Sequence, residues 1–242
     1  MHFTDQLRAE TAPLYTDLYQ LTMLQAYWAE EMHADAVFDL FVRRLKHRNV
    51  LLACGLEQAL EYLESLSFSD EAVDYLADQG TFDEAFLEWL RDFSFTGNVY
   101  AVPEGTPVFP DEPIVEVVAP IGEAQLAETY LLNQITFQTG AASKALRVVQ
   151  AATADGADRL VADFGMRRLH GTDAAMKGAR AMYIAGVGAT SNVAAGQAYG
   201  IPITGTMAHS YVEAHDMEMD AFRNFTRQYP NTILLVDTYD TM

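Results

Sequence analysis

Three apolar runs of this sequence are followed within a few residues by side chains that can do chemistry. Arg167 and Arg168 follow the run at 160–164, His209 follows the run at 201–204, and Asp237 follows the run at 232–236. We interpret each run as a buried strand, because it is short and bounded by Gly, Pro or polar residues. Since α/β enzymes place catalytic groups at the carboxyl ends of strands, these segments are candidates for a site.

Each of these groups suits a different chemical task. A histidine can act as an acid, a base or a nucleophile near neutral pH. Arginine guanidinium groups bind carboxylate or phosphate through paired hydrogen bonds. Asp237, with the hydroxyls that follow it, suits ribose hydroxyls or the ligand shell of Mg²⁺. His209 and His215 are six residues apart, which is not the spacing of a helical metal pair.

Two further segments carry weaker signals. Small residues at 186–192 precede a predicted helix, so backbone N–H groups near Ser191 and Asn192 could meet a phosphate. Tyr19 lies in a predicted helix and could stack on a flat ring. Taken singly, each of these residues also fits a structural role. The histidine could pack in the core or cap a helix, and the arginines could be solvated, with one of them bonded to Asp163. Asp237 could be a helix N-cap, and Tyr19 could lie in the core.

The composition indicates an intracellular globular protein. Half of the 242 residues are hydrophobic, which allows a sizeable core and argues against disorder. Cys54 is the only cysteine, so no disulfide can form within the chain and no cysteine-based zinc site is available. The first residues lack the basic-then-apolar order of a signal peptide, and no apolar run approaches the ~20 residues of a membrane helix. We therefore expect a cytoplasmic protein.

The charge is strongly acidic, with a formal net charge of −19. This argues against general nucleic-acid binding and against binding to an anionic membrane surface. The three lysines are Lys46, Lys144 and Lys177, a scarcity that either a high-salt cytoplasm or a GC-rich genome would explain. The one dense basic cluster lies at 43–48.

Hydrophobic periodicity predicts an α/β protein of two parts. Helices are predicted over 13–32, 51–66, 69–79, 83–93, 125–140, 141–154, 172–187, 191–199 and 211–225, and strands over 36–42, 160–164, 201–204 and 232–236. We assign residues 1–120 to an N-terminal α/β domain, with a β-rich segment at 94–118 that Gly and Pro interrupt. Residues 121–242 alternate helix and strand, which indicates a parallel sheet with helical crossovers.

The second part supplies three clear strands, too few to close a barrel. Its last apolar run is followed by polar residues and no further helix. We therefore expect that the sequence is a truncated piece, with its barrel incomplete.

Read together, five segments resemble the nicotinate phosphoribosyltransferase family. They are T-D-L-Y-Q-L-T-M (16–23), D-F-G-M-R-R-L-H-G (163–171), T-S-N-V-A-A (190–195), Y-G-I-P-I-T-G-T-M-A-H-S (199–210) and L-V-D-T-Y-D-T (235–241). They occur in the family's order and at family-like distances along essentially the whole chain. Family members usually run well beyond this length, and a later arginine–acidic segment of the G-x-R-x-D-S-G-D type is absent here.

The resemblance implies a type II phosphoribosyltransferase architecture, in which an N-terminal α/β domain precedes an irregular α/β barrel. It implies a ligase-class reaction of NAD salvage. Nicotinate, phosphoribosyl diphosphate and ATP would give nicotinate mononucleotide, diphosphate, ADP and phosphate, with Mg²⁺ as cofactor.

The resemblance also assigns roles to residues of this chain. His209 resembles the family's phosphorylated histidine, and Tyr19 and Thr206 resemble positions that contact nicotinate. Arg167 and Arg168 resemble the basic pair near carboxylate and phosphate. Asp237 resembles a residue near the ribose and Mg²⁺. We expect a homo-oligomer, most simply a dimer, in which the cluster at 43–48 reaches a neighbouring subunit's site.

Two alternatives remain open at this point. The chain could be a non-catalytic remnant or assembly module that keeps half of the barrel. It could also come from a sister enzyme that uses nicotinamide or quinolinate, although a second carboxylate usually demands a denser basic site.

Overall fold

A three-stranded antiparallel sheet forms one face of the N-terminal part. The computed structural model describes residues 11–43 and 49–240. In it, β5 (Pro113–Pro120) pairs with both β1 (Asp35–Phe41) and β3 (Asn98–Ala101), in the order β1-β5-β3. The predicted strand at 36–42 and the β-rich segment at 94–118 are confirmed. The alternation of β1 turns Phe38 and Leu40 towards the core and leaves Val37 exposed.

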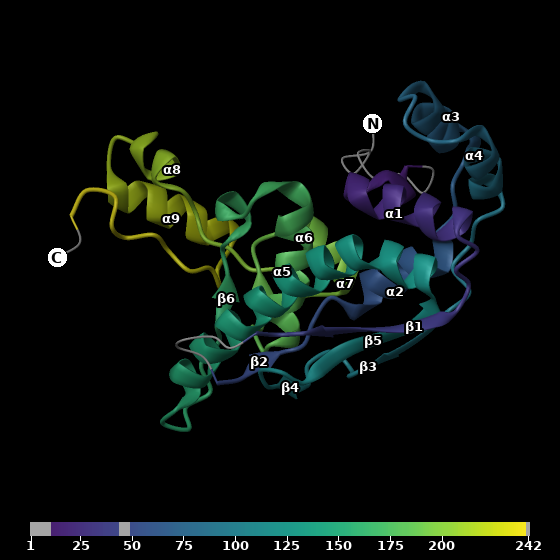
Figure 1. Cartoon of the computed structure of the whole chain (residues 1–242). Helices are drawn as coiled ribbons and strands as arrows, with labels where there is room; N and C mark the ends of the chain where they lie inside the picture. Colours follow the sequence, from purple (N-terminus) through teal and green to yellow (C-terminus); the bar gives the residue numbers. More distant parts are fainter. Residues whose placement is uncertain (1–10, 44–48, 241–242) are drawn as a thin grey trace.

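Helices cover this sheet on one side (Figure 1). The short 3-10 helix η1 (Ala12–Leu14) precedes α1 (Leu18–Ala29), and α3 (Asp70–Asp78) and α4 (Glu84–Arg91) form the acidic pair that the sequence predicts.

The single helix predicted at 51–66 is wrong at its start. Leu51 and Leu52 form β2 (Leu51–Leu52), which pairs with β4 (Pro107–Val108), and the helix α2 (Leu56–Ser65) begins later. The chain turns at Gly55, whose φ of 100° suits glycine. A Cβ there would lie 2.8 Å from the backbone oxygen of Gln134, so the loop also approaches the next long helix closely.

One helix, α5 (Ile121–Thr153), spans 33 residues and contacts both parts of the chain. The prediction of two helices that meet at 140 is therefore wrong. Glycine costs a helix interior only about 1 kcal/mol, which the packing of α5 outweighs. Its side chains bond the backbone of the neighbouring segment, since Leu52 N donates to Ser143 Oγ at 2.9 Å and Cys54 N to Thr139 Oγ1 at 3.1 Å. No helix in the described ranges is long and apolar enough to cross a membrane.

The second part of the chain alternates strands and helices, but the strand predicted at 160–164 is two residues long, the one predicted at 201–204 is a single bridge, and the strand at 189–190 was not predicted. Its elements are β6 (Ala162–Asp163), η2 (Met166–Arg168), α6 (Gly171–Ile184), β7 (Ala189–Thr190), α7 (Val193–Tyr199), α8 (His209–Glu213) and α9 (Glu218–Gln228). β6 and β7 are parallel, and Ile203 adds a parallel bridge to Thr190.

Two predictions at the C-terminal end are wrong. The helix predicted at 211–225 is two helices, because α8 ends at Glu213 and Met217 is extended, with φ −129° and ψ 127°. The run at 232–236 is not a strand. No strand pairs with it among the described residues, and a strand depends on its neighbours for stability.

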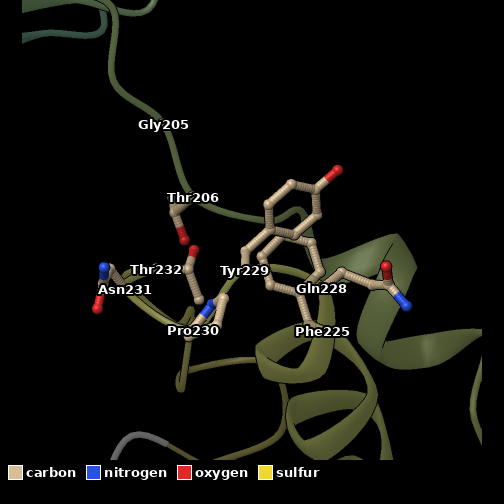
Figure 2. Close-up of a pocket in the computed structure, with 8 residues that line it drawn as sticks. All are labelled: Gly205, Thr206, Phe225, Gln228, Tyr229, Pro230, Asn231 and Thr232. Atoms are coloured by element: carbon tan, nitrogen blue, oxygen red, sulfur yellow. The ribbon is translucent and has the colours of Figure 1, made fainter.

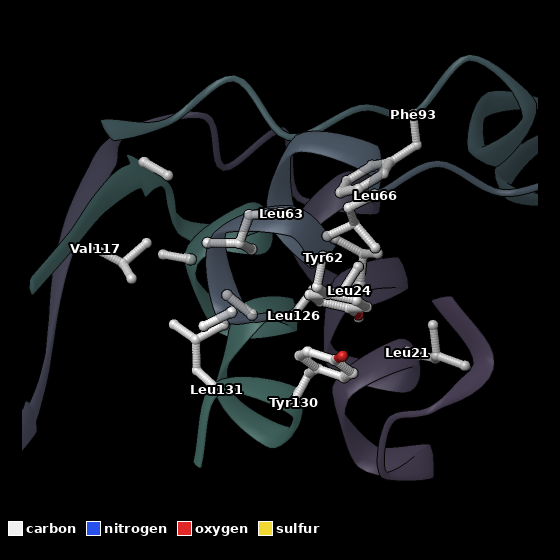
Figure 3. Packing of buried hydrophobic residues seen from close by; sticks show 14 of the residues in the cluster. Leu21, Leu24, Tyr62, Leu63, Leu66, Phe93, Val117, Leu126, Tyr130 and Leu131 are labelled. Atoms are coloured by element: carbon white, nitrogen blue, oxygen red, sulfur yellow. The ribbon is translucent and has the colours of Figure 1, made fainter. Parts of the chain in front are cut away.

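The largest core lies between the sheet and helices α1 to α5 (Figure 3). Phe86, Leu90 and Leu126 are fully buried there. The rings of Tyr62 on α2 and Tyr130 on α5 stack with their centroids 3.9 Å apart. Apolar burial therefore joins α5 to the rest of the N-terminal part.

A charged contact joins α6 to the N-terminal part. Arg180 on α6 donates to both carboxylate oxygens of Glu104, at 3.0 and 2.6 Å, and also pairs with Glu57. The Glu104 carboxylate in turn accepts from the backbone N–H groups of Gly55 and Leu56, where α2 begins. Burial opposes the charge of Glu104, but the hydrogen bonds from Arg180 and Gly55 outweigh it and hold its pKa below the ordinary value.

Leu126→Ala should lower the free energy of unfolding by about 2–5 kcal/mol, because it leaves a cavity in a fully packed core. Urea denaturation measures this change. Leu132→Ala on the same helix is the matched control, since Leu132 is 41% exposed and should cost far less. Equal losses in the two variants would contradict the core described here.

Glu104→Gln should lower the free energy of unfolding by about 2–3 kcal/mol at neutral pH, since Arg180 loses a charged partner. Because the pKa of Glu104 is lowered in the folded protein, its carboxylate contributes fully to the free energy of unfolding above the pKa of the unfolded carboxyl, about 4.3. This contribution is lost as the pH falls through the lower pKa of the folded state.

Denaturation between about pH 7 and pH 3 should therefore show a shallower acid dependence for Glu104→Gln than for the parent. Glu64→Gln changes an exposed carboxyl on α2 and is the control. An unchanged acid dependence in Glu104→Gln would refute the assignment.

Candidate active site

Asp163 organises the loop that carries the two arginines. It lies at the end of β6 with 6% of its surface exposed. One carboxylate oxygen accepts from Thr190 Oγ1 at 2.9 Å, and the other accepts from the backbone N–H of Gly165 at 2.7 Å. The carboxylate therefore joins β6 to β7 and shapes the turn into η2.

Arg167 and Arg168 leave that turn with exposed side chains. Arg168 Nη1 donates to the backbone oxygen of Phe164 at 3.2 Å. Among the described residues, no carboxylate forms a salt bridge with either arginine. Their guanidinium groups are therefore available to an anion, as the sequence suggests.

The loop after β7 has hydrogen bonds of its own. Asn192 is buried, accepts from Ala195 N at 3.2 Å as the N-cap of α7, and donates to the backbone oxygen of Ala175 at 3.4 Å. The backbone N–H of Ser191 donates to Asp163, and that of Asn192 donates to Thr190. Because these donors already have partners, the loop has a structural task, and its phosphate-binding role stays a prediction.

His209 is the first residue of α8 and is exposed. Its Nδ1 lies 3.2 Å from the hydroxyl oxygen of Thr238. Its Nε2 has no hydrogen-bond partner within the described ranges. When Nδ1 carries the proton and donates to Thr238, Nε2 keeps an unshared lone pair, which is the state that a nucleophile needs.

Thr206 borders a hollow of about 470 Å³ (Figure 2). The aromatic residues Phe225 and Tyr229 line it, with ring centroids 5.0 Å apart. The Thr206 hydroxyl donates to the backbone oxygen of Ile233 at 2.8 Å, so its proton is already committed. A planar ligand in this hollow would meet aromatic rings and the acceptor lone pairs of Thr206.

Tyr19 lies elsewhere. It is 47% exposed on α1, which Figure 1 places at the opposite side of the molecule from α8. Its hydroxyl accepts from Gln20 Nε2 at 3.0 Å, and the same amide donates to Glu128 at 2.9 Å. Partial burial, together with the nearby charges of Glu128 and Asp17, raises the pKa of Tyr19.

Asp237 is exposed beside Thr238. Among the described residues, no group of three His, Cys, Asp or Glu side chains could hold a metal ion. Mg²⁺ takes six oxygen ligands and is commonly held by one or two carboxylates together with substrate phosphates and water, so Asp237 by itself could supply only a small part of its ligand shell. We therefore assign no step to the ion.

The parallel pairing fixes where the segments that precede the candidate residues leave the sheet. Asp163 pairs with Thr190, and Thr190 forms a bridge to Ile203. Because these three segments run parallel, their carboxyl ends lie at the same end of the sheet. Sequence reasoning placed the arginines and His209 after these strands but assigned no role to Thr190 or Thr238. The only sequence feature that points to Thr238 is its hydroxyl among the polar residues that follow the apolar run at 232–236.

The fold is that of an α/β protein of the barrel-forming kind, in which short parallel strands alternate with helices. Sequence profiles confirm and refine that class. The nicotinate phosphoribosyltransferase N-terminal domain matches residues 14–136, and the nicotinate phosphoribosyltransferase family profile matches residues 160–242. The chain belongs to the nicotinate phosphoribosyltransferase family.

Known relatives agree with this assignment. The chain is 53% identical to a nicotinate phosphoribosyltransferase of Mycobacterium tuberculosis over 98% of its length, and 46% identical to one of Bacillus subtilis over 96%. It covers 50% and 47% of those proteins, so it spans about half of their length.

Solved structures share the fold. The crystal structure of human nicotinic acid phosphoribosyltransferase matches with a TM-score of 0.74 and 36% identity, over 82% of this chain and 40% of that one. A nicotinate-nucleotide pyrophosphorylase from Pyrococcus furiosus matches with a TM-score of 0.77 over 99% of this chain and 53% of that one. At 23% identity, the second match concerns the fold alone.

Thr238→Val should change the tautomer of His209, because Nδ1 loses its hydrogen-bond partner. The expected result is a shift towards the form protonated at Nε2, measured from imidazole nitrogen chemical shifts by NMR. Thr226→Val is the control, since the Thr226 hydroxyl bonds only within α9. An unchanged His209 tautomer would show that Thr238 does not orient the ring.

Proposed function

We propose that this chain carries the first half of an ATP-coupled nicotinate phosphoribosyltransferase. The reaction converts nicotinate, phosphoribosyl diphosphate and ATP to nicotinate mononucleotide, diphosphate, ADP and phosphate, and it serves NAD salvage. Family membership supports the reaction class. The observation that carries the proposal for this chain is the exposed His209, whose Nδ1 lies 3.2 Å from the Thr238 hydroxyl and whose Nε2 has no hydrogen-bond partner among the described residues.

His209 is the proposed phosphate acceptor. Its Nε2 attacks the γ-phosphorus of ATP, an N–P bond forms, and the bond from that phosphorus to the bridging oxygen breaks as ADP leaves. Thr238 accepts the Nδ1 proton in a hydrogen bond and keeps the Nε2 lone pair free. Water later cleaves the N–P bond and releases phosphate, which returns the histidine to its starting state.

The transfer step depends on positioning and charge. The pyridine nitrogen of nicotinate attacks the anomeric carbon, while the bond from that carbon to diphosphate breaks. The transition state resembles an oxocarbenium ion, so oriented reactants and stabilised leaving-group charge supply the rate enhancement. Arg167 and Arg168 are the proposed cations for the nicotinate carboxylate and the phosphates, since no carboxylate in the described chain engages them.

Nicotinate is the proposed ring substrate, with Thr206 and Tyr19 as its contacts. Thr206 borders the aromatic hollow and offers an acceptor there. Tyr19 lies on the far side of the molecule, so its contact would come from another copy of the chain. This favours the expected dimer. The basic cluster at 43–48 has the same proposed task, although 44–48 lie outside the described residues.

The remaining assignments stay predictions. Asp237 is proposed to lie near the ribose and any Mg²⁺ that accompanies the diphosphate, and the cytoplasm is the proposed location. The division of the chain at residue 120 is proposed as the domain boundary.

The decisive experiment is a nicotinate mononucleotide assay on the purified chain, with and without ATP, alongside covalent labelling by γ-labelled ATP. In a full-length version of the protein, we expect His209→Ala to abolish labelling and ATP stimulation while it leaves slow ATP-independent transfer. His215→Ala is the matched control, because its ring Nδ1 bonds only the Tyr211 backbone oxygen one turn earlier.

Equal ATP stimulation in His209→Ala and the parent would refute the role of His209. Absence of both label and product in the parent chain would favour the non-catalytic alternative. Faster product formation from nicotinamide or quinolinate would refute the choice of nicotinate.

A further inference from the structure

A second pocket lies at the other end of the molecule, between the end of α1, α4 and the start of α5. Its volume is about 140 Å³. Four aromatic side chains line it, Tyr27, Trp28, Trp89 and Phe93, and we call it the aromatic pocket. Figure 1 shows α1 and α4 far from α8, so the aromatic pocket is separate from the candidate active site.

The rings stand at angles to one another. The planes of Trp28 and Trp89 differ by 40°, and those of Trp89 and Phe93 by 74°, with centroids 6.4 and 5.6 Å apart. Rings set at such angles form walls rather than one flat stack. Each wall offers the electron-rich face or the edge of an aromatic ring to an occupant.

A carboxylate completes the lining. Glu123, in the first turn of α5, accepts from the backbone N–H of Thr96 at 2.6 Å and from its hydroxyl at 3.0 Å. These bonds hold the carboxylate in place, and its remaining lone pairs can accept further hydrogen bonds. Among the described lining residues none is lysine or arginine, and His33 is the one that can become a cation.

We propose that the aromatic pocket binds a small organic cation, a methylated ammonium group, between the tryptophan rings and the Glu123 carboxylate. Ring faces attract such cations, and the attraction grows as the cation loses water. The size agrees, because a cavity of about 150 Å³ holds one benzene-sized molecule. The net charge of −19 favours a cationic over an anionic ligand at this surface.

Tryptophan fluorescence can detect binding in this pocket, because the two tryptophans of the sequence, Trp28 and Trp89, both line it. Titration with choline should give a saturable change in tryptophan fluorescence. The uncharged carbon analogue 3,3-dimethyl-1-butanol and sodium chloride at equal ionic strength should give none. Equal binding of the uncharged analogue would refute a cation site, and so would the absence of saturation with choline.

Variants separate the two parts of the site. Glu123→Gln keeps an acceptor for Thr96 and should weaken choline binding by roughly fivefold to tenfold. Glu84→Gln, an exposed residue on α4, makes the same change in net charge and should leave the affinity unchanged.

Trp89→Leu should weaken binding more than Trp89→Phe, with circular dichroism confirming that each variant is folded. Equal affinity in Glu123→Gln and Glu84→Gln would overturn the role of Glu123. Equal affinity in the two Trp89 variants would overturn the role of the aromatic ring.

Discussion

The packing of α5 is the constraint on which the rest of the structure depends. Its side chains replace strand partners for the backbone of β2 and the loop after it, through Ser143 and Thr139. Its first half carries the apolar contacts of the N-terminal core, and its second half packs on α6 through small residues such as Ala142 and Ala145. The orientation of α6, and through it of the short parallel strands, therefore follows from one helix.

Some arginines of the described chain form salt bridges within the fold, and others do not. Arg180 is engaged by Glu104 and Glu57, and Arg91 by several acidic side chains on α3 and α4. Arg167 and Arg168 have no such partner in the described chain. In a protein with a net charge of −19, the overall charge repels anions, so these two guanidinium groups are where we propose that anions bind.

Much of the fold could be predicted because its signals are local. Ser69 accepts from Ala72 N as the N-cap of α3, and the alternation of β1 shows directly which face is buried. The errors occurred where partners distant in sequence decide the outcome. Leu51 and Leu52 form a strand because β4 lies beside them, and residue 140 stays helical because α5 is packed along its length. The run at 232–236 has strand-like composition, but no strand pairs with it in the part of the chain that the structure describes.

The candidate site divides in the same way. The sequence by itself determined the family, the helical and β-rich segments, and the positions of His209, Arg167 and Arg168 after apolar runs, because motif spacing and hydrophobic periodicity are written in consecutive residues. Only the tertiary structure decided that Thr238 contacts His209, that Asp163 bonds Thr190, that Asn192 donates to the backbone oxygen of Ala175, and that Tyr19 lies apart. Those contacts join residues that are distant along the chain or exposed to solvent, and their geometry arises only when α5 and the parallel strands have brought the segments together.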